Sequence, residues 1–239
     1  MRFDIITIFP KIFDSYLNES IIKRARKNKK IKINIINLRD FATDRHKTVD
    51  GKPYGGGPGM VFKIEPLAKV IGSILKRKIK RTLIPAAARI KVILFSTSGK
   101  QFNSKMAAEW AKKYDRIIMI AGHYEGVDER IKKIIIENWK LSLFGRSPTG
   151  RKIEELSIGP YVLTGGELPA MVVIDAISRH ISGVLGKYES LEEKRYGVGV
   201  PMYTRPETFI YKNKKYSVPK VLLSGNHKKI ENWRKKHQK

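Results

Sequence analysis

The sequence predicts an α/β protein in which a mostly parallel sheet carries helices on both faces. Two observations favour this class. Short β-branched runs alternate with segments whose apolar residues recur at helical spacing, and this alternation is typical of parallel sheets, whose strands are joined by crossover helices. Hydrophobic residues make up 41% of the 239 residues, which suits one main core with a small appendage.

Five strands are expected where runs rich in Ile, Val and Phe are bounded by turn residues. These runs are Phe3 to Phe9, Ile31 to Leu38, Lys91 to Phe95, Ile117 to Ile120 and Ile158 to Leu163. Pro66 suits the first turn of a helix whose apolar stripe runs from Leu67 to Leu75. Asn103 and Asp128 are expected to cap two more helices, and another is expected from Pro169 to Ile181.

The character of the sequence changes after residue 186. Residues 1–186 are expected to form the main domain, and residues 187–202, where glycines and a proline stand among charged residues, predict a flexible linker. Residues 203–239 predict a small basic domain that ends in a helix containing Ile230 and Trp233. A segment this short supports little core of its own.

The charge of the chain points to a polyanionic partner. There are 49 Lys and Arg against 22 Asp and Glu, a formal net charge of +27, and residues 212–239 hold a single acid, Glu231. Nucleic acid is favoured over a membrane surface because no long amphipathic cationic helix stands out. No signal peptide or apolar run of about 20 residues is visible, and cysteine is absent. These features predict a soluble protein and are compatible with a reducing cytoplasm.

Three glycine-bearing loops follow predicted strands and therefore open at one edge of the sheet. They are Ser96 to Gly99, Gly122 to Gly126 and Thr164 to Gly166. Ligands of open α/β sheets bind beyond the carboxyl ends of the strands, so a binding site is expected here. A fourth glycine-rich segment, Asp50 to Met60, fits neither the P-loop nor Gly-x-Gly-x-x-Gly. The five histidines are scattered, so no dedicated metal centre is expected.

Seven motifs in order along nearly the whole chain resemble the bacterial tRNA (guanine-N1)-methyltransferase family TrmD. They are Arg39-Asp-Phe with Asp44 to Asp50, Pro53 to Met60, Gly122 to Arg130, Ser157 to Met171, Gly183 to Gly186, Tyr203-Thr-Arg-Pro206 and Val221 to His227. The resemblance implies a SPOUT-class fold whose carboxyl-terminal part forms a trefoil knot. It also implies a homodimer, S-adenosylmethionine bound in the knot, and a tRNA substrate: the guanosine at position 37, beside the anticodon. Residues 203–239 are accordingly expected to form a small, mainly helical, basic domain that binds tRNA.

The resemblance also assigns site residues. It implies a cofactor pocket lined by Phe95, Ser96, Gly122, Tyr124, Gly126, Ile158, Gly159, Pro160, Tyr161, Val162, Leu163, Gly165, Gly166 and Pro169. His46 and Asp50 would help to bind the target base within the anticodon stem-loop. Arg179 matches the family arginine associated with the target guanine, whereas spacing alone favours an ordinary i,i+4 pair with Asp175. Mg²⁺ is compatible with this chemistry, although no residue pattern here specifies a site for it.

The chain departs from the family where its linker is expected to supply an aspartate base. The sequence there reads Glu192-Glu-Lys-Arg-Tyr196, so Glu193 is the first candidate for the general base and Glu192 the second. Residues 138–152 form an insertion, and Pro160 replaces an expected aspartate. Two alternatives stay open: a SPOUT ribose 2′-O-methyltransferase and a non-catalytic RNA-binding protein with a degenerate pocket. Cofactor binding would separate the second from the enzymes.

Overall fold

The computed structural model describes residues 1–76, 89–141, 153–186, 191 and 199–237. They form two compact units, Met1–Val184 and Leu185–Lys239. The first unit holds every strand of the main sheet. The strands of the main sheet are β1 (Arg2–Thr7), β2 (Lys32–Asn37), β5 (Ile90–Gln101), β6 (Arg116–Ile120) and β7 (Glu154–Ser157). Between β2 and β5 in the sequence, β3 (Asp50–Gly51) and β4 (Val61–Phe62) form a separate two-stranded sheet.

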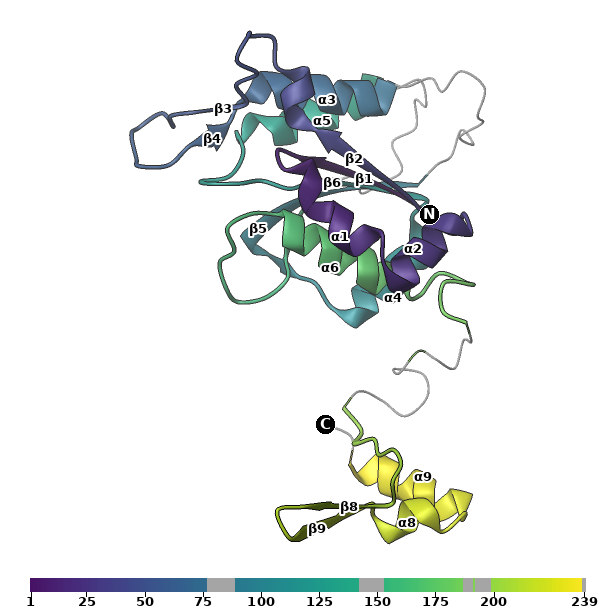
Figure 1. Ribbon diagram of the computed structural model, residues 1–239. Helices are drawn as coiled ribbons and strands as arrows, with labels where there is room; N and C mark the ends of the chain where they lie inside the picture. The colour runs from purple at the N-terminus through teal and green to yellow at the C-terminus, as the bar shows by residue number, and fades with distance from the viewer. Residues whose placement is uncertain (77–88, 142–152, 187–190, 192–198, 238–239) are drawn as a thin grey trace. The chain divides into compact units, whose positions relative to one another are not determined.

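The main sheet has five parallel strands in the order β2-β1-β6-β5-β7, which confirms the predicted fold class (Figure 1). β2 lies at one edge of the sheet, on one side of β1. The later strands lie on the other side of β1, where β6 is placed between β1 and β5. All three loops that follow β5, β6 and β7 therefore belong to neighbouring strands. The carboxyl ends of these strands meet at one edge of the sheet.

Two strand predictions were wrong in their bounds. The fifth strand is Glu154–Ser157, not Ile158 to Leu163, which forms bends. The chain turns after Ser157, whose hydroxyl donates to the Gly159 C=O at 2.9 Å, so the apolar residues that follow do not continue the strand. The third strand also runs beyond Phe95 to Gln101, with a register shift against β7 between Phe95 and Lys100. The predicted loop 96–99 is thus a distorted part of β5 rather than its end.

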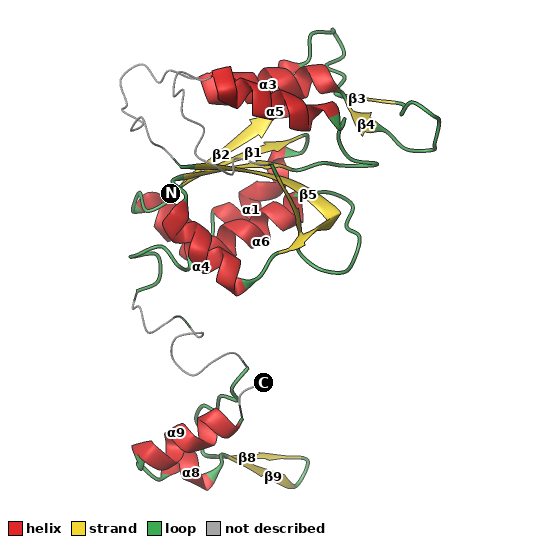
Figure 2. Cartoon of the chain, turned by 180° about the vertical axis from the view of Figure 1, so that it is seen from behind, coloured by secondary structure: helices red, strands yellow, loops and turns green. Residues whose placement is uncertain are grey.

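Helices cover both faces of the sheet. The helices α3 (Ile64–Lys76) and α5 (Arg130–Leu141) lie on one face, and α1 (Asp14–Leu17), α2 (Ser20–Lys27), α4 (Ser104–Lys113) and α6 (Glu167–Ser178) lie on the other (Figure 2). Two 3₁₀ turns, Pro10–Phe13 and Leu38–Phe41, follow β1 and β2. Each face has its own apolar core: in β6, Ile117 and Met119 belong to one and Ile118 and Ile120 to the other. All of β6 is buried, as expected for a strand covered on both faces.

The predicted helix starts are confirmed. The Asn103 side chain accepts a hydrogen bond from the Met106 backbone N–H at 3.0 Å, and the Asp128 side chain accepts one from the Arg130 N–H at 3.0 Å. These acceptors satisfy N–H groups that have no partner within the first turn. The helix expected from Pro169 to Ile181 begins two residues earlier, at Glu167, and ends at Ser178.

The second unit is small. It contains a hairpin of β8 (Thr208–Tyr211) and β9 (Lys214–Ser217), followed by α8 (Lys220–Leu223) and α9 (His227–Lys236). The last of these is the helix predicted around Ile230 and Trp233, and the Trp233 ring packs 6.3 Å from that of Tyr203. Most of the predicted linker 187–202 lies outside the described residues. Within the described part of the chain, no helix is long and apolar enough to cross a membrane.

A buried ion cluster crosses the amino-terminal half of the main sheet. The fully buried carboxylate of Asp4 accepts hydrogen bonds from Arg116 Nε at 2.6 Å and Arg2 Nη2 at 2.7 Å. Asn34 on β2 donates a third at 3.0 Å, so the cluster joins three adjacent strands. Burial by itself would raise the pKa of the Asp4 carboxyl, but the two guanidinium groups and Asn34 lower it below its ordinary value.

We expect Asp4→Asn to lower the free energy of unfolding by about 3 kcal/mol at pH 7, because it leaves two guanidinium groups without their buried counter-charge. The folded-state pKa of Asp4 is lowered, so this contribution is present above the unfolded value near 3.9 and is lost as the pH falls below it. Urea unfolding of both proteins at pH 7 and pH 3 measures this. The matched control is Glu109→Gln, which removes an exposed pair with Lys113 and should cost less than about 1 kcal/mol.

Candidate functional site

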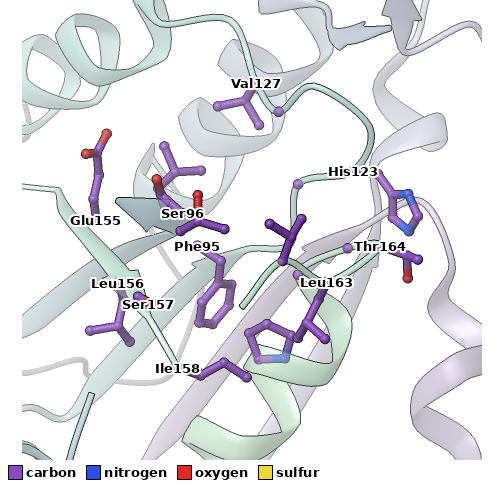
Figure 3. A pocket seen from close by; sticks show the side chains of 18 of the residues that line it. Phe95, Ser96, His123, Val127, Glu155, Leu156, Ser157, Ile158, Leu163 and Thr164 are labelled. Carbon is purple, nitrogen blue, oxygen red and sulfur yellow. The ribbon is translucent and has the colours of Figure 1, made fainter. Parts of the chain in front are cut away.

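A cavity of about 320 Å³ lies at the carboxyl edge of the sheet, where the sequence predicted a binding site. Its walls come from the end of β5, the loop after β6 and the segment from β7 to the first turn of α6. Figure 3 shows Phe95, Ile158 and Leu163 close together inside it, with Glu155 and His123 at opposite sides of the view. The volume is at the lower end of the range for small-molecule sites, and the mixture of apolar walls with a few polar groups is typical of them.

The loop before α6 is held against the loop after β6 by direct backbone contact. Gly166 N–H donates to Gly122 C=O at 2.8 Å, and His123 pairs with Gly165 as an isolated bridge. A Cβ atom on Gly166 would lie 2.6 Å from Ala121 Cα, which is backbone and cannot move aside. A glycine is therefore required for the two loops to approach this closely.

A similar approach shapes the opposite wall. A Cβ on Gly99 would lie 2.5 Å from the backbone between Glu155 and Leu156. The distorted part of β5 can therefore cross close to β7, and Phe95, Ser96 and Thr97 face the cavity from there. Glycines at both walls thus allow three chain segments to enclose one space.

The segment Asp50 to Met60 is tied to the loop after β6. Glu125 N–H donates to Met60 C=O at 3.0 Å, and Phe62 N–H donates to Gly126 C=O at 3.0 Å. Directly before these contacts, Tyr124 has a φ of 57°, which is an unfavourable backbone conformation for a residue with a side chain. The surrounding hydrogen bonds hold this conformation at the rim of the cavity, a kind of strain that often accompanies binding sites.

The titratable groups of the cavity are mostly acidic. Glu125, Glu129 and Glu155 line it, and no Lys or Arg is among the described residues that do so. Lys132 lies behind them, where it donates to Glu129 at 2.6 Å and also pairs with Glu155. These two carboxylates raise the pKa of Lys132. In a chain with a net charge of +27, the charged side chains that line the cavity are thus all carboxylates, with Lys132 as the partner of two of them behind the wall.

A buried polar chain connects the cavity to β1. The fully buried Thr7 hydroxyl donates to Glu167 Oε1 at 2.7 Å, and the second oxygen of Glu167 lies 3.6 Å from His123 Nε2. Glu167 is itself buried in the first turn of α6. The His123 ring also packs edge-on against Phe9, with ring centroids 5.1 Å apart.

The structure brings together nearly all of the residues assigned to a cofactor pocket. Of that set, Gly159 and Pro160 belong to the same loop but do not line the cavity. His46 lies in an exposed turn and Asp50 in β3, and neither is part of the lining. Glu192 and Glu193 lie outside the described residues, as do residues 142–152 of the predicted insertion. The carboxylate of Asp175 accepts a hydrogen bond from the Tyr16 hydroxyl, and its pairing with Arg179 stays a prediction.

Arg179 stands apart from the cavity. It follows the last residue of α6, while Gly166, at the other end of that helix, lines the cavity. Thirteen residues at 1.5 Å each separate the two by about 20 Å, more than an arginine side chain spans. Within one chain, the spacing does not bring Arg179 to the site.

Sequence reasoning missed several lining residues, chiefly His123, Glu125, Glu129 and Glu155. His123 and Glu125 lie inside a motif that was recognised, and their position after β6 could have identified them. Glu155 could not be found in the same way, because the strand that holds it was expected four residues later in the chain.

A parallel α/β sheet with a glycine-lined cavity at its carboxyl edge defines an α/β ligand-binding protein of the kind used by many transferases. The whole chain, residues 1–239, matches the family described as tRNA (guanine-1)-methyltransferase TrmD, and the chain belongs to this family of enzymes. Its members carry the SPOUT fold with a trefoil knot, in agreement with the parallel sheet seen here.

Named relatives agree with this assignment over nearly their full length. The tRNA (guanine-N(1)-)-methyltransferase of Moorella thermoacetica is 44% identical over 98% of this chain and 84% of that protein. The proteins of the same name from Carboxydothermus hydrogenoformans and Clostridioides difficile are 45% and 44% identical, covering 99% and 98% of this chain and 82% and 91% of theirs. The match favours the first of the functions considered from the sequence over the two alternatives.

We expect Gly166→Ala to weaken binding of S-adenosylmethionine at least tenfold, because the added methyl group forces the Gly166 and Ala121 backbones apart. Overpacking of this kind costs about 1–3 kcal/mol of stability. Titration calorimetry and urea unfolding measure the two effects. Gly72→Ala is the matched control: its Cβ meets nothing within 4 Å in the middle of α3, so it should add up to about 1 kcal/mol of stability and leave binding unchanged.

Proposed function

We propose that the protein transfers a methyl group from S-adenosylmethionine to N1 of the guanosine at tRNA position 37, next to the anticodon. Membership of the TrmD family carries this proposal. The acidic cavity at the sheet edge supports it independently, since a basic protein that bound only polyanions would have no use for it.

The cavity fits the cofactor in shape and charge. When bound, S-adenosylmethionine supplies an activated methyl group on a positively charged sulfur. Phe95, Ile158 and Leu163 offer an apolar surface for its adenine, and the carboxylates of Glu129 and Glu155 suit hydroxyl and ammonium donors. Gly122 and Gly165 also line the cavity and add no side chain to it. The same cavity is poorly suited to a phosphate, because its nearest charges are negative.

The target base must lose its N1 proton. A carboxylate close to the target would accept it, and Glu193, with Glu192 second, remains our assignment for this base. Alignment of the base with the methyl group contributes most of the remaining acceleration. Single-turnover rates measured against pH test the assignment: a wild-type rate and profile in both Glu193→Gln and Glu192→Gln would exclude it.

Arg179 is proposed to act on the guanine, where a guanidinium group would stabilise negative charge that develops at O6. Its distance from the cavity of its own chain supports a homodimer in which Arg179 of one protomer serves the cavity of its partner. His46, Asp50 and the glycine-rich segment that follows them are proposed to cover the base, supported by the hydrogen bonds that tie this segment to the cavity loop.

We expect the protein to methylate a tRNA transcript that has guanosine at position 37 and to leave a transcript with adenosine there unmodified, because adenine has an amino group where guanine O6 would accept a hydrogen bond from Arg179. Labelled S-adenosylmethionine and identification of the product nucleoside measure this. N1-methylguanosine is the expected product. A 2′-O-methylated nucleoside would support the ribose methyltransferase instead, and absence of both transfer and cofactor binding would support the binding protein.

We expect two inactive variants to restore activity when they are co-expressed. Arg179→Ala lacks the substrate arginine, and Leu163→Arg blocks the cavity. If Arg179 acts across a two-fold dimer, each mixed dimer has one complete site, and random pairing gives about a quarter of wild-type activity. No recovery in dimers verified by sedimentation would place Arg179 in the site of its own chain or outside the site altogether. Arg179→Ala should retain wild-type cofactor affinity.

A further inference from the structure

We propose that one face of the β8–β9 hairpin is a stacking surface for unpaired RNA bases. This aromatic face, as we call it, consists of Phe209, Tyr211 and Tyr216, with Lys214 beside them. The inference deepens the proposed function and rests on it for the source of the RNA, which is the loop of the substrate tRNA. It concerns the second unit by itself and needs no contact with the first.

The strand register puts these side chains on the same face. Phe209 pairs with Tyr216 and Tyr211 pairs with Lys214 across the antiparallel ladder, and directly opposed residues project to the same side of a sheet. Phe209 and Tyr211 are two apart on one strand, so they also share a side. The rings of Phe209 and Tyr211 are within 12° of parallel, with centroids 6.4 Å apart.

The rings are exposed to an extent that folding does not explain. Phe209 is 56% exposed, and Tyr211 and Tyr216 are 54% exposed. Three large aromatic side chains on one side of a two-stranded hairpin contribute little to the core while they face water. A contiguous aromatic surface of this kind marks an interaction site in soluble proteins.

The opposite face of the same hairpin is different in character. It carries Thr208 and Ser217, whose hydroxyl groups lie 3.1 Å apart, together with Ile210 and Lys215. Lys212 and Asn213, the two residues of the connecting turn, both have positive φ, 46° and 59°. This is the type I′ geometry that matches strand twist, so the turn presents the aromatic face in a defined orientation.

The charge around the aromatic face selects nucleic acid as its partner. Lys212 Nζ lies 5.5 Å from the centroid of the Tyr211 ring, and Lys214 shares the aromatic face across the ladder from Tyr211. Lysines that track a phosphate backbone, combined with rings on which bases stack, are the usual elements of single-strand binding surfaces. A second copy of the chain would bring the same lysines to the contact and would be repelled.

Unpaired bases suit this surface better than a duplex does. The bases of an A-form helix are stacked on one another and reached only through its grooves, whereas the bases of a loop can turn outward and stack on aromatic side chains. The anticodon loop is an unpaired region of the substrate that the proposed function assigns, so it is the expected ligand.

Binding of two fluorescein-labelled RNAs to the full-length protein tests the proposal. One is an anticodon stem-loop and the other is the same stem made fully paired. We expect Phe209→Leu with Tyr211→Leu, which keeps apolar side chains but removes the rings, to weaken stem-loop binding about tenfold or more. Duplex binding and the salt dependence of both affinities should not change, because phosphate contacts remain. Tyr211→Phe should retain wild-type binding.

Two control variants make the outcome specific. Ile210→Ala, on the opposite face and 67% exposed, should leave both affinities unchanged. Lys214→Gln should reduce the salt slope by about 0.7–0.9 for either RNA. Equal loss for stem-loop and duplex, no loss for either, or dissociation of the dimer in the double variant by sedimentation would overturn the proposal. Failure of wild-type methyl transfer would instead count against the proposed function, which this binding assay does not measure.

Discussion

The site depends on the close backbone contact between Gly166 and Ala121. This contact, together with the Gly166–Gly122 hydrogen bond, sets the loop before α6 against the loop after β6. Because α6 begins at this point, the contact also sets where Pro169 enters the cavity wall and where Glu167 meets Thr7 and His123. The close contact between these two backbone segments thus forms the cavity and sets where the side chains that line it can lie.

A second constraint is the separation of charge within a strongly basic chain. Three negative side chains have cationic partners at defined places: Asp4 is enclosed by guanidinium groups in the sheet, and Glu129 and Glu155 share Lys132 at the cavity. Positive side chains dominate the second unit, in which the aromatic face also lies. A cationic cofactor and a polyanionic substrate can therefore be bound by one protein without competing for the same surface.

Much of the fold could be predicted because its signals are local. The runs that became β1, β2 and β6, the caps at Asn103 and Asp128 and the stripe of α3 each depend on neighbours in the sequence. The prediction failed at β7, where apolar residues follow Pro160 and resemble a strand. The true strand, Glu154–Ser157, has only a weak pattern in the sequence because it contains one large apolar residue. It forms a strand because its backbone hydrogen-bonds to β5. That pairing joins segments some sixty residues apart and leaves no local trace.

By itself, the sequence determined the fold class, the edge of the sheet that binds a ligand and most of the residues that line the cavity. It did so because strand direction assigns each following loop to an edge, and because the family motifs occur in order. Only the tertiary structure decided that Glu129 and Glu155 share Lys132 at the wall, and that Thr7, Glu167 and His123 lie in one polar chain beside the cavity. Each of these depends on how distant segments approach one another, which spacing along the chain does not specify.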